Sequence, residues 1–144
     1  MLRNIDPILS PECLQILRAM GHGDDLVIAD SNFPATTCAK RLIRMDGIDG
    51  PRALEAILKL FPVDDFVKDP ILRIEVVDNP SFLPPVCQEY QTIVDKHADN
   101  KAKIQPIDRF AFYDRSKAAF AVIATGELRL YGCLILKKGV IRPA

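Results

Sequence analysis

The chain has 144 residues, and its 19 lysines and arginines balance its 19 aspartates and glutamates, so the formal net charge is zero. This length corresponds to one ordinary domain, and we expect a single unit over residues 1–144. The charges are balanced and interspersed, which argues against nucleic acid or an anionic membrane as a partner, because both attract strongly basic patches.

The apolar runs are short, and the four cysteines are far apart. No run approaches the roughly 20 residues that cross a bilayer, and the N-terminus lacks the apolar core and cleavage site of a secretory signal. We therefore expect a cytoplasmic protein with no membrane partner. No two cysteines form a C-x-x-C pair and there are only two histidines, so we expect free thiols and no metal site. The cysteines are Cys13, Cys38, Cys87 and Cys133, and the histidines are His22 and His97.

The first 35 residues predict a helix, a strand and a loop. Ser10-Pro11-Glu12 is typical of a helix start, and the apolar spacing continues to about Met20, where Gly21 suits a left-handed C-terminal cap. Asp25 to Ala29 is a short apolar run that predicts a strand buried on both faces, and Asp30 follows its C-terminal end. Ligands of open α/β sheets gather beyond such strand ends, so Asp30 is well placed for function.

Short apolar strands and amphipathic helices alternate along the remaining chain. This pattern predicts an α/β fold, which we expect to be a single-domain three-layer sandwich around a mostly parallel, mixed sheet. Residues 31–35 are expected to form a loop. The strands are expected over 42–46, 71–77, 103–107, 120–125 and 130–136, and the helices over 49–61, over 85–96 and from a cap at Asp108 onward.

His22 is the strongest candidate for chemistry. The unperturbed pKa of histidine lies closest to neutrality, and glycines on both sides let the backbone expose the imidazole to a ligand. Asp30 is its candidate partner. The alternative is that Gly21 and Gly23 form an ordinary turn in which His22 only caps the helix.

Three further positions have both a functional and a structural interpretation. Arg109, in the first turn of a helix, could bind hydroxyls or a carboxylate, or could be a solvated surface arginine. Tyr131 beside Gly132 in the last strand could present its phenol to a ligand, or could pack at the sheet edge. Cys133 could be a nucleophile with His22, but buried cysteine is usually an inert small hydrophobe.

Five segments then carry a family resemblance. They are Met20-Gly21-His22-Gly23-Asp24, Asp30 with Phe33-Pro34-Ala35, Arg44-Met45-Asp46-Gly47, Arg109-Phe110-Ala111-Phe112-Tyr113, and Tyr131-Gly132-x-Leu134 with Lys137-Lys138-Gly139-Val140. In this order they resemble the L-fucose mutarotase branch of the fucose mutarotase and ribose pyranase family, from near residue 1 to about residue 140. The ribose pyranase branch has a histidine near the place of Arg109, so the Arg-Phe-Ala-Phe-Tyr run favours the fucose branch.

The resemblance implies the fold of that family and an enzyme that interconverts sugar anomers without a cofactor. It also implies a ring-shaped homo-oligomer, commonly a decamer, with sites at subunit junctions. Position by position, His22 matches the family's proton donor, Asp30 and Arg109 match its sugar-binding residues, and Tyr131 with Gly132 begins its Tyr-Gly-Asn motif. The third position is Cys133, which lacks the donors and acceptor of an asparagine amide.

We therefore expect a mutarotase for L-fucose or a similar pyranose. His22 would act as acid and base, Asp30 as partner base or orienting acceptor, and Arg109 and Tyr131 as groups that bind hydroxyls. Such proton transfer is typically worth about 10² to 10⁴ in rate. The alternatives are a monosaccharide-binding module without turnover, a ribose pyranase-type activity, and a thiol- or metal-dependent enzyme that uses Cys133.

Overall fold

Four of the five helices of the computed structural model, which describes residues 1–144, begin where their sequences predict. The Ser10 hydroxyl caps α1 (Pro11–Ala19) by accepting a hydrogen bond from the Cys13 amide. Asp49 and Asp108 cap α3 (Gly50–Leu58) and α5 (Arg109–Ala118) in the same way, and α4 (Pro85–His97) starts with a proline. These caps pair amides that have no partner inside the helix.

Two helical features differ from the prediction. α2 (Ala35–Cys38) is a single helical turn where the sequence predicts only a loop, since four residues are too few to show helical periodicity. Gly21 does not form a left-handed cap, because the C-cap of α1 is Met20 with φ of −60°. The positive φ, 86°, falls at Gly23 instead, so the residues around His22 form a turn of their own.

Six strands form one sheet in the order β2-β5-β1-β6-β3-β4. β5 pairs in parallel with both β1 and β2, and β3 pairs in parallel with β4. β6 lies between β1 and β3 and is antiparallel to both, so it runs against every other strand. The predicted α/β fold with a mostly parallel, mixed sheet is confirmed. The strands are β1 (Asp25–Ala29), β2 (Leu42–Met45), β3 (Ile71–Ile74), β4 (Gln105–Ile107), β5 (Ala121–Thr125) and β6 (Leu134–Lys137).

The last strand is shorter than predicted. The expectation of a strand over 130–136 is wrong for its first half, because β6 begins only at Leu134 and the preceding residues form a turn. Tyr131 in that turn has φ of 64°, a left-handed conformation that no strand contains. β3 also ends early, at Ile74 and not at Val77. The residues after Ile74 form a loop that leads to α4.

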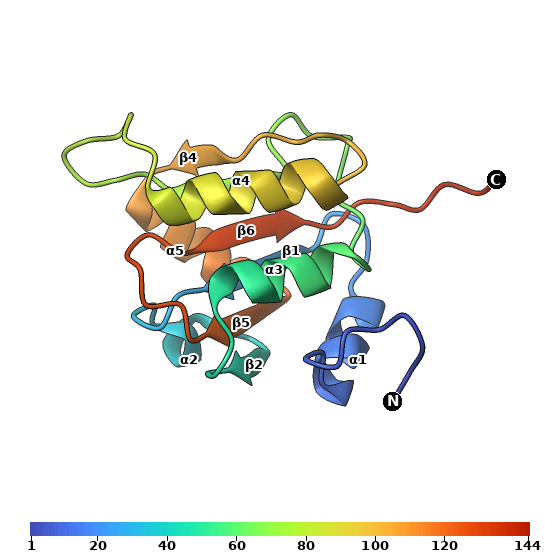
Figure 1. Ribbon diagram of the computed structural model, residues 1–144. Helices are drawn as coiled ribbons and strands as arrows, with labels where there is room; N and C mark the ends of the chain where they lie inside the picture. The colour runs from blue at the N-terminus through green and yellow to red at the C-terminus, as the bar shows by residue number, and fades with distance from the viewer.

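Helices cover both faces of the sheet. On one face, α1, α3 and α4 contribute to the larger apolar core, and Figure 1 shows α3 and α4 lying in front of the sheet. On the other face, α2 and α5 pack over the smaller core, which contains Phe33, Phe112 and Cys133. None of the helices has the length and apolar character needed to cross a membrane.

The strand directions define two edges of the sheet. At the Asp30 edge, the C-terminal ends of β1 to β5 meet the start of β6. At the opposite His22 edge, the turn before β1 meets the end of β6, since the Gly23 amide donates to the Lys138 carbonyl at 2.8 Å. Residues on the two ends of β1 therefore face different surfaces of the molecule.

Candidate active site at two edges of the sheet

The Asp30 carboxylate is fixed by backbone amides. Its Oδ1 accepts a hydrogen bond from the Asn32 amide at 3.0 Å, and its Oδ2 accepts one from the Gly132 amide at 3.2 Å. The side chain directly follows β1, and Asp30 is only 7% exposed. A carboxylate oriented in this way keeps lone pairs for a ligand hydroxyl, because each oxygen can accept more than one hydrogen bond.

Gly132 makes this contact possible. A Cβ at this position would lie 2.8 Å from Cγ of Glu127 and 3.3 Å from Cβ of Asp30. Separations this short require the neighbouring atoms to shift, which is costly in a packed interior. Glycine at position 132 therefore lets the turn before β6 approach Asp30 without displacing its neighbours.

Tyr131 presents its phenol at the same edge. Its hydroxyl oxygen accepts a hydrogen bond from the Val77 amide at 3.2 Å, so its own proton is free for another acceptor. The left-handed φ of 64° is costly for a residue with a side chain. The backbone thus bears strain at the residue that would contact a ligand.

Arg109 is the first residue of α5, as predicted, and it is exposed. Its guanidinium lies over the Phe110 ring, 4.8 Å from the centroid. The ion pairs of the chain do not include Arg109. Its donors are therefore available to a ligand at the Asp30 edge.

Cys133 is buried and supports the same turn. Its Sγ lies 3.3 Å from the Asp30 amide nitrogen, which donates to it. Burial raises the pKa of the Cys133 thiol well above its usual value, and the nearby Asp30 carboxylate adds to this effect. A thiol that resists ionisation is a poor nucleophile, and Cys133 also packs within the smaller core.

These side chains line one small cavity of about 200 Å³. Clefts that hold drug-sized ligands measure roughly 300–1,000 Å³, so this cavity suits a ligand of about the size of a monosaccharide. The wall combines polar and aromatic groups with an aliphatic side formed by three residues. The polar and aromatic members are Asp30, Asn32, Phe33, Arg109, Tyr113, Tyr131 and Cys133, and the aliphatic members are Ile74, Val77 and Leu130.

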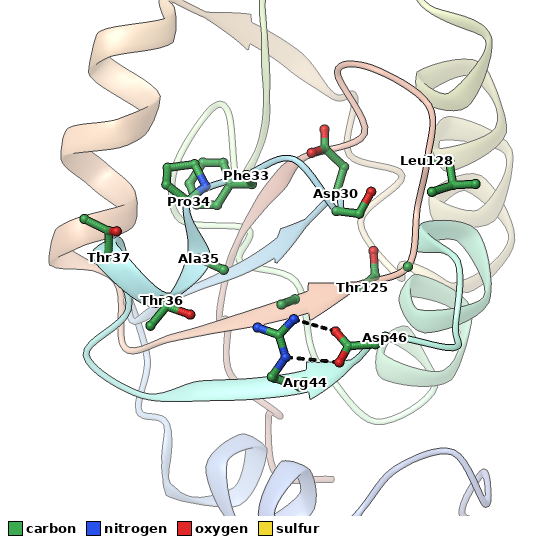
Figure 2. Close-up of a pocket in the computed structure, with 13 residues that line it drawn as sticks. Asp30, Phe33, Pro34, Ala35, Thr36, Thr37, Arg44, Asp46, Thr125 and Leu128 are labelled. Carbon is green, nitrogen blue, oxygen red and sulfur yellow. Dashed lines mark hydrogen bonds and ion pairs between the residues drawn. The ribbon is translucent and has the colours of Figure 1, made fainter.

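A larger cavity, about 370 Å³, lies at the same edge beside α2. Asp30 lines this cavity as well, but its other two charged residues are already paired, since Arg44 contacts both carboxylate oxygens of Asp46 at 3.1 and 2.8 Å. Figure 2 shows the Asp30 carboxylate pointing away from this pair. We assign the candidate site to the smaller cavity, where Asp30, Arg109 and Tyr131 meet.

His22 lies at the opposite edge and pairs with a residue that the sequence analysis missed. Its Nε2 lies 2.9 Å from Oδ1 of Asp64. The imidazole ring also packs against the Phe66 ring, with centroids 4.9 Å apart. The proposed pairing of His22 with Asp30 does not occur within one chain, because β1 alone separates them by about 13 Å.

The end of β6 positions both members of the His22–Asp64 pair. The Lys137 carbonyl accepts a hydrogen bond from the Asp64 amide at 3.0 Å, and the Lys138 amide donates to the Asp24 carbonyl at 2.8 Å. The second carboxylate oxygen of Asp64 accepts from the Val67 amide at 3.2 Å. No periodicity or motif marks Asp64, so only the fold reveals its role beside His22.

The structure thus brings five of the six predicted site residues together at the Asp30 edge and places His22 elsewhere. The five are Asp30, Arg109, Tyr131, Gly132 and Cys133. The sequence analysis did not predict Asn32, Tyr113 and Val77, which also line the cavity, or Asp64, which pairs with His22. No three histidine, cysteine, aspartate or glutamate side chains converge in a way that could hold a metal ion.

Comparison with known proteins gives the family. The sequence profile of the RbsD / FucU transport protein family matches residues 3–141. The chain belongs to this family. Its relatives in the RbsD / FucU family include the L-fucose mutarotase of Actinobacillus pleuropneumoniae serotype 5b (strain L20), which is 44% identical over 140 residues, covering 97% of each chain. The fucose mutarotase of Homo sapiens is 46% identical over 146 residues, covering 97% of this chain and 94% of the human protein.

Solved structures of RbsD / FucU family members have the same fold. The fucose mutarotase from Streptococcus pneumoniae, in complex with L-fucose, is 42% identical and superposes with a TM-score of 0.90, covering 98% of this chain and all (100%) of that one. RbsD of Bacillus subtilis, complexed with D-ribose, is 21% identical with a TM-score of 0.71 over 99% of this chain and 100% of that one. The predicted family resemblance is confirmed.

Proposed function

We propose that this protein is a mutarotase that interconverts the α and β anomers of L-fucose or a closely similar pyranose. The observation that carries the proposal is the convergence of Asp30, Arg109 and Tyr131 on one cavity of monosaccharide size. The likeness to fucose mutarotases over almost the whole chain supports the choice of sugar.

We further propose that each site is completed by a second copy of the chain, with residues 1–144 acting as one sugar-binding unit. His22 is too far from Asp30 to serve the same sugar within one chain, so His22 of a neighbouring copy would complete the cavity. Apolar side chains are exposed at both edges, which supports burial of these surfaces between copies. They are Phe66, Val67 and Ile141 at the His22 edge, and Val77, Phe82 and Leu130 at the Asp30 edge.

The reaction follows from the donors and acceptors of this composite site. A carboxylate at Asp64 accepts a hydrogen bond from Nε2–H of His22, so the proton of the neutral imidazole stays on Nε2 and Nδ1 keeps its lone pair. Nδ1 removes the proton of the anomeric hydroxyl, the carbonyl forms, and the bond between C1 and the ring oxygen breaks. The ring oxygen takes up a proton, for which the free donor of Tyr131 is well suited. The aldehyde turns about its C1–C2 bond, and the reverse steps close the ring on its other face.

Binding groups explain why the sugar stays in place while the ring opens. Asp30 accepts hydrogen bonds from hydroxyls, and Arg109 donates to hydroxyl oxygens. The aliphatic wall of Ile74, Val77 and Leu130 offers no hydrogen bond. This wall suits the methyl group of a 6-deoxy sugar such as L-fucose better than a hydroxymethyl group, whose hydroxyl would lose its water.

Exchange NMR on an anomeric mixture of L-fucose tests the activity. The protein should accelerate exchange between the two anomer signals, and His22→Ala should return the rate to the buffer value with the fold intact. A protein that binds fucose but leaves the exchange rate unchanged would be a binding module. The same measurement with D-ribose and D-galactose ranks the candidate sugars.

Mixing two inactive variants tests the composite site. His22→Ala keeps an intact Asp30 edge, and Asp30→Asn keeps an intact His22 edge. When the two are unfolded and refolded together, a random assembly should recover about a quarter of the wild-type activity, because that share of junctions pairs the two intact edges. No recovery, with mixed assemblies demonstrated by mass spectrometry, would place the whole site in one chain.

We also propose a closed ring, such as a decamer, and a cytoplasmic location. A ring gives every copy a neighbour at both edges, which is what a site built from unlike edges requires. All four cysteines are free and buried, which supports a reducing compartment. Sedimentation equilibrium measures the assembly directly, and a fully active monomer would contradict it.

A further inference from the structure

Tyr90 contacts the Asp30 edge from the face of the sheet that the larger core and α4 cover. It lies in α4 within the larger core, and it is 0% exposed. Its hydroxyl donates a hydrogen bond to the Gly132 carbonyl at 2.8 Å. Burial raises the pKa of the Tyr90 phenol, so the hydroxyl retains its proton and remains a donor at every physiological pH.

Gly50 makes room for the Tyr90 hydroxyl. Any side chain at Gly50, at the start of α3, would overlap the phenol oxygen. One turn earlier on α4, the Cys87 Sγ approaches the Tyr131 carbonyl at 3.5 Å. Cys87 and Tyr90 are three residues apart, so they lie on the same face of α4. Their side chains therefore contact two consecutive carbonyls of the turn before β6.

Gly132 links Tyr90 to the carboxylate. Its carbonyl accepts from Tyr90, while its amide donates to Oδ2 of Asp30 at 3.2 Å. The Gly132 carbonyl and the Gly132 amide belong to successive peptide groups that are joined at the Gly132 Cα. Loss of the Tyr90 contact would let the backbone dihedral angles of Gly132 change, which would loosen the amide contact with Asp30 and move Tyr131. A misplacement of about 1 Å in a catalytic group can reduce the rate by about a hundredfold.

We infer that Tyr90 is a positioning residue of the active site, which holds the Tyr131–Gly132 turn in its strained, ligand-ready form without touching the sugar. This inference rests on the proposed function, since it assigns Tyr90 a role in that same site. The alternative is that Tyr90 only fills the core beneath α4.

Tyr90→Phe separates the two roles, because it removes one oxygen and keeps the ring that fills the core. We expect kcat for anomer exchange at saturating L-fucose to fall about tenfold or more. Ser116→Ala is the matched control. It also deletes a buried hydroxyl that donates to a backbone carbonyl. In this case the acceptor is the Phe112 carbonyl at 2.8 Å, and both residues lie in α5. The control should keep the wild-type kcat.

Amide hydrogen exchange gives a readout that does not depend on turnover. In Tyr90→Phe, the amides of Gly132 and Asn32, both bonded to Asp30, should exchange faster than in the wild type, while the amides of α4 remain protected. Unchanged kcat, KM and Gly132 exchange in Tyr90→Phe would overturn the inference. A wild-type protein that does not accelerate anomer exchange would instead refute the proposed function, and the exchange of the Gly132 amide would still test the role of Tyr90.

Discussion

His22 and Asp64 form an asymmetric pair, with Nε2 and Oδ1 2.9 Å apart and side-chain exposures of 44% for His22 and 1% for Asp64. The buried carboxylate can orient the imidazole and select one tautomer, while the opposite side of the ring stays open to a ligand. This division of roles is typical of histidines that transfer protons.

Asp64→Asn should lower the rate of anomer exchange by about tenfold or more, because an amide no longer selects one imidazole tautomer. Exchange NMR with L-fucose measures the rate. Asp65→Asn is the control, since Asp65 is the next residue but pairs with Arg142 at the surface. If Asp64→Asn and Asp65→Asn were equally active, Asp64 would have no part in catalysis.

Gly132→Ala should weaken sugar binding and destabilise the fold. The added methyl group would meet Glu127, the Arg129 carbonyl and Asp30 within 2.8–3.3 Å, and such overpacking typically costs about 1–3 kcal/mol. Urea unfolding and fucose titration measure the two effects. Gly47→Ala, where no atom lies within 4 Å of the added carbon, should leave affinity unchanged. Equal affinity in both variants would show that the turn does not depend on a glycine.

Activity should survive the loss of the Cys133 thiol. Burial raises the pKa of Cys133, so the thiolate that nucleophilic catalysis requires is scarce at neutral pH. Cys133→Ser, assayed in the presence of a chelator, should keep the acceleration of anomer exchange in its folded fraction. Complete loss of activity in a folded Cys133→Ser protein would revive the thiol mechanism.

Stability should fall between about pH 4.5 and pH 2 in part because of Glu55. Hydrogen bonds from His97 and Lys96 lower the pKa of Glu55 from 4.5 to about 2. The unfolded chain therefore binds this proton at a higher pH than the native protein, and acid favours unfolding across that interval. Melting temperatures measured from pH 5 to pH 2 should decline less steeply in Glu55→Gln. Parallel curves for the variant and the wild type would exclude a contribution from Glu55.

Much of the fold could be predicted because local chemistry marks it. Three helices begin directly after capping residues whose side chains pair with first-turn amides. The capping residues are Ser10 for α1, Asp49 for α3 and Asp108 for α5. The apolar run of β1 was predicted with its observed bounds. The turn at Tyr131 could not be predicted in this way, since an apolar run indicates a strand and a left-handed tyrosine is rare.

The candidate site was predictable only in part. Asp30 follows the end of β1, and Arg109 begins the helix that follows β4. Topology alone therefore places both residues at one edge of the sheet. Asp64 lies 42 residues from His22 in sequence, and no local sequence feature distinguishes this buried acid from the acids at the surface. Its contact with His22 depends on the direction of β6, because the end of that strand binds both segments.

His22 and Asp30 lie at opposite ends of β1, so a substitution in one copy would also inactivate a site that it shares with a neighbouring copy. In the proposed ring each chain completes two different sites, one with each neighbour. A chain altered at both edges therefore silences two junctions, and the activity of a mixed population would fall with the square of the intact fraction. Loss of function in such an assembly would be partly dominant, although every chain carries a complete set of site residues in its own sequence.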